Sequence, residues 1–138
     1  MKIVKTLLNI FKESSEESQD WLIAPKDLSA SFELYFKDIK VGVLKLDKSE
    51  WVFEYSEEFK QQSSLNPIID FPDINKTYHS KELWPFFSIR VPSVERPNIR
   101  ELINQGQIDN IVTLLEKFGS KTIANPYDLV VILADKKN

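Results

Sequence analysis

The sequence predicts a small α+β domain in which an antiparallel meander sheet packs with short helices. Two observations support this fold class. The chain has 138 residues, 42% of them hydrophobic and 12% aromatic, which is typical of one folded domain with its own core. Apolar residues also alternate with polar ones in the first half, whereas the second half shows helical spacing.

Three stretches in the first half have the alternation expected of half-buried strands. In the first stretch the apolar positions are Phe32, Leu34 and Phe36. The stretches 41–46 and 51–55 follow after short connections, which predicts three consecutive antiparallel strands. A further apolar stretch, 129–133, predicts a buried strand near the end of the chain.

Helix signals occur at three places. Ser56 precedes two glutamates, as the N-cap of a short helix does. Pro97 is suited to the first turn of a helix that Gly106 ends. A second helix is predicted over residues 108–118, with Gly119 as its C-terminal cap.

The first residues differ from the rest, which divides the chain into an N-terminal segment, 1–20, and a domain, 21–138. Residues 3–11 place apolar side chains on one helical face, and residues 13–20 form a polar linker. Two alternatives stay open for this helix. It packs on its own domain or a neighbouring protein, or it lies on a membrane surface with the help of Lys2, Lys5 and Lys12. No small-residue cleavage site follows, so we expect an uncleaved, cytoplasmic protein.

Charge and residue content exclude several classes of protein. The chain carries 18 basic and 21 acidic residues, a net charge of −3, which argues against direct binding of nucleic acid. Cysteine is absent, which excludes disulfides, thiolate zinc ligands and a thiol nucleophile. No apolar run reaches the roughly 18 residues that a membrane span requires.

The sequence offers no set of residues suited to catalysis, metal binding or cofactor binding. His79 is the only histidine and lies in a polar stretch typical of a surface loop, so a multi-histidine metal site is excluded and a Ser-His-Asp triad is unsupported. The three glycines are far apart, whereas a phosphate-binding loop needs them clustered. We therefore expect no catalytic residue, no metal and no cofactor. The protein is predicted not to be an enzyme and to act by binding another protein.

Two segments with aromatic residues are candidates for protein contact: 83–87 and the proline-bracketed, extended segment 67–72. The residues that we expect to bind a partner are Phe71, Trp84, Phe86 and Phe87. Aromatic residues anchor protein–protein interfaces, although packing in the core is the alternative for each of them.

Four motifs, in this order, resemble those of HipA-type proteins. A Val-Gly-Val-Leu strand at 41–44 is followed by Phe-Glu-Tyr at 53–55 and an acidic–aromatic helix start. The segments 67–72 and 83–87 resemble the proline-bracketed and aromatic elements of that family, and 114–119 resembles its late helix end.

The resemblance extends over residues 31 to about 133 and implies the N-terminal subdomain of a HipA-type toxin kinase. In such kinases the ATP-binding and catalytic segments lie beyond this subdomain and have no counterpart in this chain. Free-standing versions occur in split toxin–antitoxin systems, beside a separately encoded serine/threonine kinase and a DNA-binding antitoxin. The resemblance therefore implies an antitoxin-like bacterial regulator that binds the kinase and controls its activity. The alternative is an adaptor tethered through its N-terminal helix to a membrane surface or a protein partner.

Overall fold

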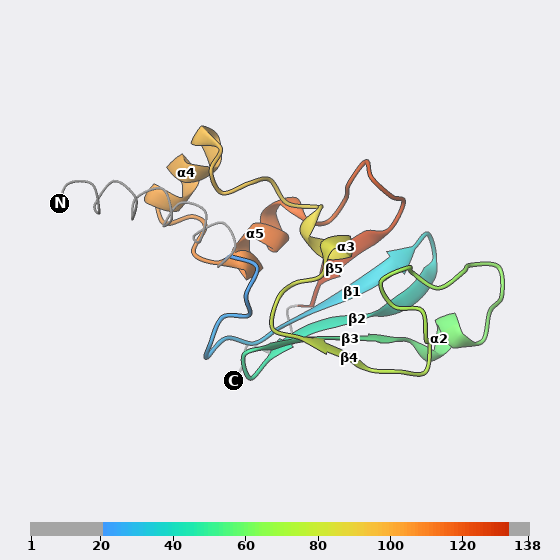
Figure 1. Cartoon of the computed structure of the whole chain (residues 1–138). Coiled ribbons are helices and arrows are strands. Elements are labelled where there is room, and N and C mark those ends of the chain that lie inside the picture. Colours follow the sequence, from blue (N-terminus) through green and yellow to red (C-terminus); the bar gives the residue numbers. More distant parts are fainter. Residues whose placement is uncertain (1–20, 133–138) are drawn as a thin grey trace, which may run out of the picture.

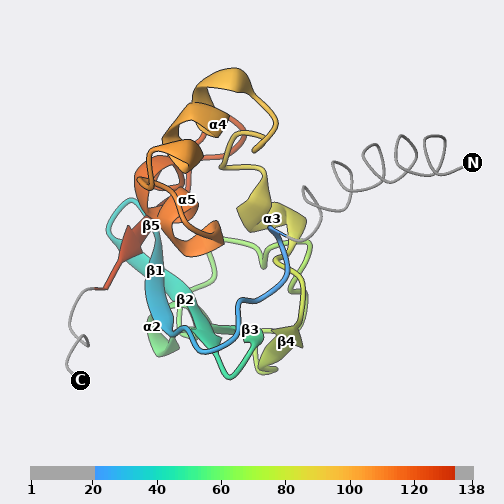
Figure 2. The ribbon, with the colours of Figure 1, turned by 90° about the vertical axis from the view of Figure 1, so that its left-hand side faces the viewer.

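The structure, a computed structural model, describes residues 21–132. A five-stranded antiparallel sheet has the strand order β4-β3-β2-β1-β5, and α3, α4 and α5 lie over one of its faces (Figures 1 and 2). The strands are β1 (Ala30–Phe36), β2 (Ile39–Asp47), β3 (Glu50–Tyr55), β4 (Tyr78–Ser80) and β5 (Asp128–Val131). The helices are α2 (Glu57–Lys60), α3 (Pro85–Ser88), α4 (Pro97–Asn104) and α5 (Ile111–Phe118). The predicted α+β fold is confirmed.

The predicted meander is also confirmed, because β1 pairs with β2 and β2 pairs with β3, both in antiparallel register. Only Lys48 and Ser49 connect β2 to β3, and both have positive φ angles, 52° and 66°. Such turns match the right-handed twist of the two strands that they join. The resulting register places Leu44 opposite both Phe32 and Phe53, so the apolar residues of three strands face the same side.

The hydrophobic core lies between the sheet and the helices. The central strands contribute Phe32, Leu34, Leu44, Leu46, Trp51, Phe53 and Tyr55, all of them buried. Gly42 in β2 leaves the space that the ring of Phe53 fills. A Cβ at Gly42 would lie 2.7 Å from Phe53 Cζ and 2.6 Å from the carbonyl oxygen of Glu54.

Helix α5 begins at Ile111 and not at Ile108, as the sequence predicted. Asn110 Oδ1 accepts hydrogen bonds from the N–H groups of Val112 and Thr113, at 2.9 and 3.2 Å. Thr113 Oγ1 in turn accepts from the N–H of Asn110 at 3.2 Å. This capping box sets the start of the helix, because it satisfies N–H groups that otherwise have no partner. Ile108 precedes the helix and is still buried.

The other helix signals are confirmed. Ser56 Oγ accepts from the N–H of Phe59 at 3.0 Å and so caps α2. Pro97 occupies the first turn of α4. Gly119 ends α5 with ordinary right-handed backbone. A Cβ there would lie 2.7 Å from the carbonyl oxygen of Leu115, so glycine is needed at this position for close approach.

Three expectations about local structure are corrected. The last strand is an edge strand and not a buried one, since β5 pairs only with β1. Leu129 is buried, but Val130, on the other face of the sheet, is 47% exposed. His79 is exposed as expected but lies in the edge strand β4, where its Nδ1 is 3.2 Å from the carboxylate of Glu50. The aromatic segment 83–87 contains the start of a helix, α3, which the sequence did not predict.

The predicted helix over residues 3–11, the linker over 13–20 and the last residue of the predicted strand 129–133 lie outside the described residues. The division of the chain at residue 20 therefore stays a prediction. Of the helices that the structure describes, none is long and apolar enough to cross a membrane.

Replacing Gly42 by alanine is expected to lower the free energy of unfolding by about 2 kcal/mol, because the added methyl group must displace the ring of Phe53. Chemical denaturation measures this loss. Lys45→Ala, at an exposed position of the same strand, serves as the control and is expected to change the value by less than about 0.5 kcal/mol. Equal free energies of unfolding for the two variants would contradict the close packing at Gly42.

Candidate partner-binding groove

Three segments that are far apart in the sequence meet beside α3 and line an open groove. One wall is the loop 66–70, the second is α3 with the residue that follows it, and the third is the loop 124–127 before β5. The volume of the groove is about 590 Å³. Its lining residues are Asn66, Pro67, Ile68, Ile69, Asp70, Pro85, Phe86, Ile89, Ala124, Asn125 and Tyr127.

Tyr55 holds the first wall in place. Its hydroxyl donates a hydrogen bond to the carbonyl oxygen of Phe71 at 2.6 Å and accepts one from the N–H of Ile68 at 2.8 Å. These bonds fix the segment 67–72 against the sheet, with Ile68 turned inward and Ile69 turned outward. The expectation of an extended segment is wrong here, because residues 68–71 form a turn in which the N–H of Phe71 donates to the carbonyl oxygen of Ile68 at 2.8 Å. Burial raises the pKa of Tyr55 to about 12. Sequence reasoning missed this role, since a tyrosine in an alternating strand looks like any other core residue.

The four aromatic residues predicted to bind a partner form one cluster. The ring of Phe71 contacts the rings of Trp84 and Phe87, with centroids 5.0 and 6.1 Å apart, and Phe86 lies 5.1 Å from Phe87. Phe71 and Phe87 are fully buried and belong to the core. Trp84 and Phe86 are only partly buried. The structure therefore divides these four residues into two that are fully buried and two that are partly exposed, and of the latter Phe86 lines the groove.

Asp70 joins the first wall to the second. Its Oδ2 accepts a hydrogen bond from the N–H of Phe86, in the first turn of α3, at 3.2 Å. A carboxylate at this position satisfies an N–H group that has no partner inside the helix. Among the residues that line the groove, only Asp70 and Tyr127 have ionisable side chains.

Arg90 holds the third wall. It lies two residues after the end of α3, is 5% exposed, and spreads its guanidinium under the loop that leads to β5. Nη1 donates to the carbonyl oxygens of Gly119 and Ser120 at 3.0 and 3.3 Å. Nη2 donates to Asn125 Oδ1 at 3.1 Å and to the carbonyl oxygen of Tyr127 at 2.8 Å. Burial lowers the pKa of Arg90, but an arginine stays charged at any physiological pH.

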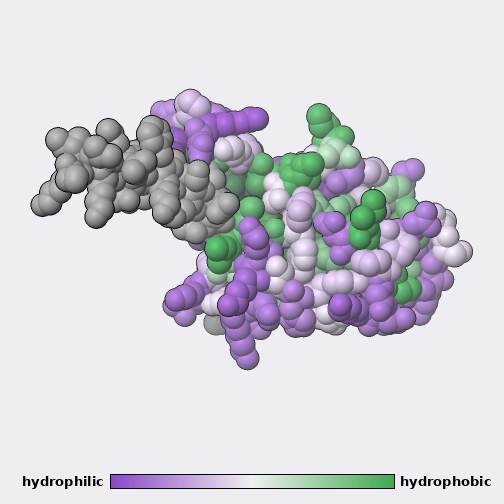
Figure 3. Space-filling view, viewed as in Figure 1, coloured by the Kyte–Doolittle hydropathy of each residue, from purple (hydrophilic) through white to green (hydrophobic). Residues whose placement is uncertain are grey.

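The rim of the groove exposes large aliphatic side chains. Ile69 in the first wall is 92% exposed, Ile89 after α3 is 58% exposed, and Ile123, next to the third wall, is fully exposed. Figure 3 shows hydrophobic side chains over α3 and standing out from the loop before β5. Large exposed apolar side chains around a groove are candidates for protein contact.

The lining of the groove is mostly apolar. Its lining contains no histidine, no lysine or arginine and no hydroxyl other than that of Tyr127. His79, the only histidine of the chain, lies on the opposite edge of the sheet from β5. Within residues 21–132, no group of three or more His, Cys, Asp or Glu side chains is placed to hold a metal ion.

Residues 32–124 match the family model described as the HipA N-terminal domain. The chain belongs to the HipA N-terminal domain family. This confirms the resemblance seen in the sequence and associates the protein with toxin–antitoxin systems. A comparison with curated proteins gives no match. The family region contains the first two walls of the groove completely and ends at Ala124, within the third.

The Tyr55 hydroxyl gives the stability of the domain a dependence on alkaline pH. Its pKa is about 12 in the folded protein and about 10 when unfolded, so its contribution is present below pH 10 and is lost as the pH rises towards 12. We expect Tyr55→Phe to lower the free energy of unfolding by about 2 kcal/mol near pH 8. The loss of stability between pH 10 and 12 is also expected to be smaller in this variant. Denaturation across this range measures both effects, and an identical alkaline slope in wild type and variant would contradict the assignment.

Arg90→Lys is expected to lower the free energy of unfolding by about 3 kcal/mol, although it keeps the charge. One ammonium group cannot reach the four acceptors that the planar guanidinium fork bonds. Arg96→Lys, at an exposed position just before α4, is the matched control. Thermal and chemical unfolding of both variants are compared, and equal stability would show that the fork is not required.

Proposed function

We propose that the protein is a non-enzymatic, antitoxin-like regulator that docks on a separately encoded HipA-like serine/threonine kinase and controls its activity. The observation that carries the proposal is the apolar groove beside α3 with its rim of exposed isoleucines. Membership of the HipA N-terminal domain family supports the choice of a HipA-like protein as the partner.

The groove has the composition of the central part of a protein interface. Such regions are apolar, lack most charged residues and bury a few large side chains that carry most of the binding energy. Ile69 and Ile89 supply exposed apolar area on two different walls, and the partly buried Phe86 belongs to the same lining. Transfer of these side chains from water into a complementary surface is the source of affinity in this proposal.

The walls are held rigidly, which favours recognition of a folded partner. Tyr55, Asp70 and Arg90 each fix one wall by hydrogen bonds to the backbone or to a helix end. Binding to a pre-organised surface loses less conformational entropy than binding to a loop that must first become ordered. The described domain therefore presents the rim residues in fixed positions.

Trp84 is the residue that we propose to act on the conformation of the kinase. It directly precedes α3, and its ring packs edge-on against the buried ring of Phe71, with centroids 5.0 Å apart. A bulky side chain supported in this way acts as a wedge between the parts of a kinase. It controls activity only if it binds one kinase conformation better than another.

Ile69→Asp and Ile89→Asp are each expected to weaken binding of the full chain to the proposed partner, a HipA-like kinase, by at least about 10-fold. The reason is that each variant places a charge in a desolvated interface, while the exposed position leaves the fold unchanged. Titration calorimetry measures the affinity, and thermal unfolding checks the fold. Val130→Asp, an equally polar change at an exposed position on β5, is the control.

The variant Trp84→Ala separately tests the proposed effect of Trp84 on the kinase, with autophosphorylation of the kinase as the measurement. A change in kinase activity at saturating concentrations of the variant, with binding retained, supports the proposal. Wild-type affinity for both isoleucine variants would rule out this groove as the docking surface.

A further inference from the structure

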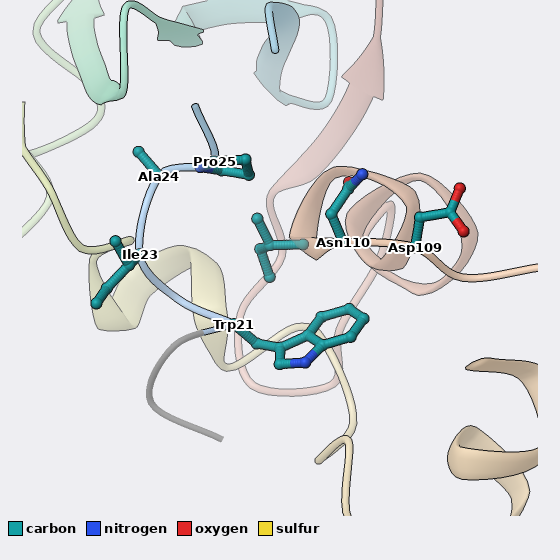
Figure 4. Close-up of a pocket in the computed structure, with 7 residues that line it drawn as sticks. Trp21, Ile23, Ala24, Pro25, Asp109 and Asn110 are labelled. Atoms are coloured by element: carbon teal, nitrogen blue, oxygen red, sulfur yellow. The ribbon is translucent and has the colours of Figure 1, made fainter. Parts of the chain in front are cut away.

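Two shallow apolar clefts flank Trp21, the first residue that the structure describes. The larger, of about 360 Å³, lies between residues 21–25 and the start of α5. Figure 4 shows residues 21–25 curving around one side of this cleft, with Asp109 and Asn110 on the other. The smaller, of about 190 Å³, lies between Trp21 and the residues after α3. Both clefts share Trp21 and Ile111 as walls.

The Trp21 wall is attached firmly to the domain. The carbonyl oxygen of Leu22 accepts hydrogen bonds from the N–H of Leu83 at 2.7 Å and from Trp51 Nε1 at 3.3 Å. The N–H of Ala24 donates to the carbonyl oxygen of Lys81 at 2.7 Å. The N-terminal segment therefore joins the domain at a fixed point, between the two clefts.

The clefts and the N-terminal segment are complementary in polarity and charge. Asp109 is the only charged residue that lines either cleft. Residues 1–12 contain three lysines and no acidic residue. Their apolar side chains, at helical spacing on one face, are Ile3, Val4, Leu7, Leu8, Ile10 and Phe11. This face has no partner in the proposed function of the groove beside α3.

We propose that the apolar face of residues 3–11 docks in cis onto the two clefts that flank Trp21, with its lysines on the side of Asp109. The chain between Phe11 and Trp21 spans up to about 35 Å when extended, so reach does not limit docking. Tethering through a connection this short gives an effective concentration of the order of 1 mM, so even a weak contact is populated. This proposal does not depend on the proposed kinase partner. It concerns the clefts around Trp21, which the N-terminal residues of the same chain would cover, and not the groove beside α3.

The absence of cysteine from the chain makes thiol crosslinking a clean test. Thr6→Cys is combined in the full chain with Ser93→Cys, an exposed position that lines the smaller cleft. The control combines Thr6→Cys with Ser63→Cys, in the loop after α2, which Figure 1 places far from α5. A short bifunctional maleimide is added at low protein concentration, and intramolecular product is measured by electrophoresis and mass spectrometry.

We expect the 6–93 pair to crosslink at least about 10-fold faster than the 6–63 pair. Adding Leu7→Asp and Leu8→Asp is expected to reduce the 6–93 rate to that of the control, and Asp109→Lys to reduce it in part. Equal rates for the two pairs would overturn the proposal. A 6–93 rate unchanged by Leu7→Asp and Leu8→Asp would also overturn it. If the 6–93 and 6–63 pairs crosslink at equal rates and the full chain also binds vesicles of anionic phospholipid, the proposal is overturned. The N-terminal residues would then be assigned to a membrane surface.

Discussion

The buried guanidinium of Arg90 is the contact on which the groove side of the molecule depends. Among the described residues it is the one charged side chain that is buried. Its cost of desolvation is offset by four hydrogen bonds, three of them to backbone carbonyls of the segment between α5 and β5. That segment has little regular structure of its own, so Arg90 links the end of α3 to the edge strand and fixes the third wall of the groove.

The opposite wall depends on a polar contact inside an aromatic core. The rings of Phe53 and Phe71 stack with centroids 4.4 Å apart, which holds the turn over residues 68–71 against the sheet. Apolar stacking alone does not fix the direction of that segment, whereas the two hydrogen bonds of the Tyr55 hydroxyl do. As a result Ile68 points into the core and Ile69 into solvent. Two buried polar groups on different elements therefore determine which aliphatic side chains are exposed.

The aromatic and aliphatic residues of the groove fall into two groups, one buried in the core and one exposed or partly exposed. Phe71 and Phe87 keep the walls together from within, while Ile69 and Ile89 are exposed and Trp84 is partly buried. A second apolar surface, around Trp21, lies where the N-terminal segment enters the domain. In the function that we propose, the two surfaces have different occupants: a HipA-like kinase on the first, and the chain's own N-terminal residues on the second.

The local pattern of the sequence determined the meander and the helix starts at Ser56 and Pro97, because alternation and capping depend on neighbouring residues. It also indicated that the segments 67–72 and 83–87 belong together in function, and residue content determined which chemistries are excluded. Only the tertiary structure decided that Phe71 and Phe87 turn inward and that isoleucines form the rim. The physical reason is that these orientations depend on the partners of Tyr55 and Arg90, which are up to 37 positions away in the chain. Contacts at such a distance leave no periodic signal in the sequence.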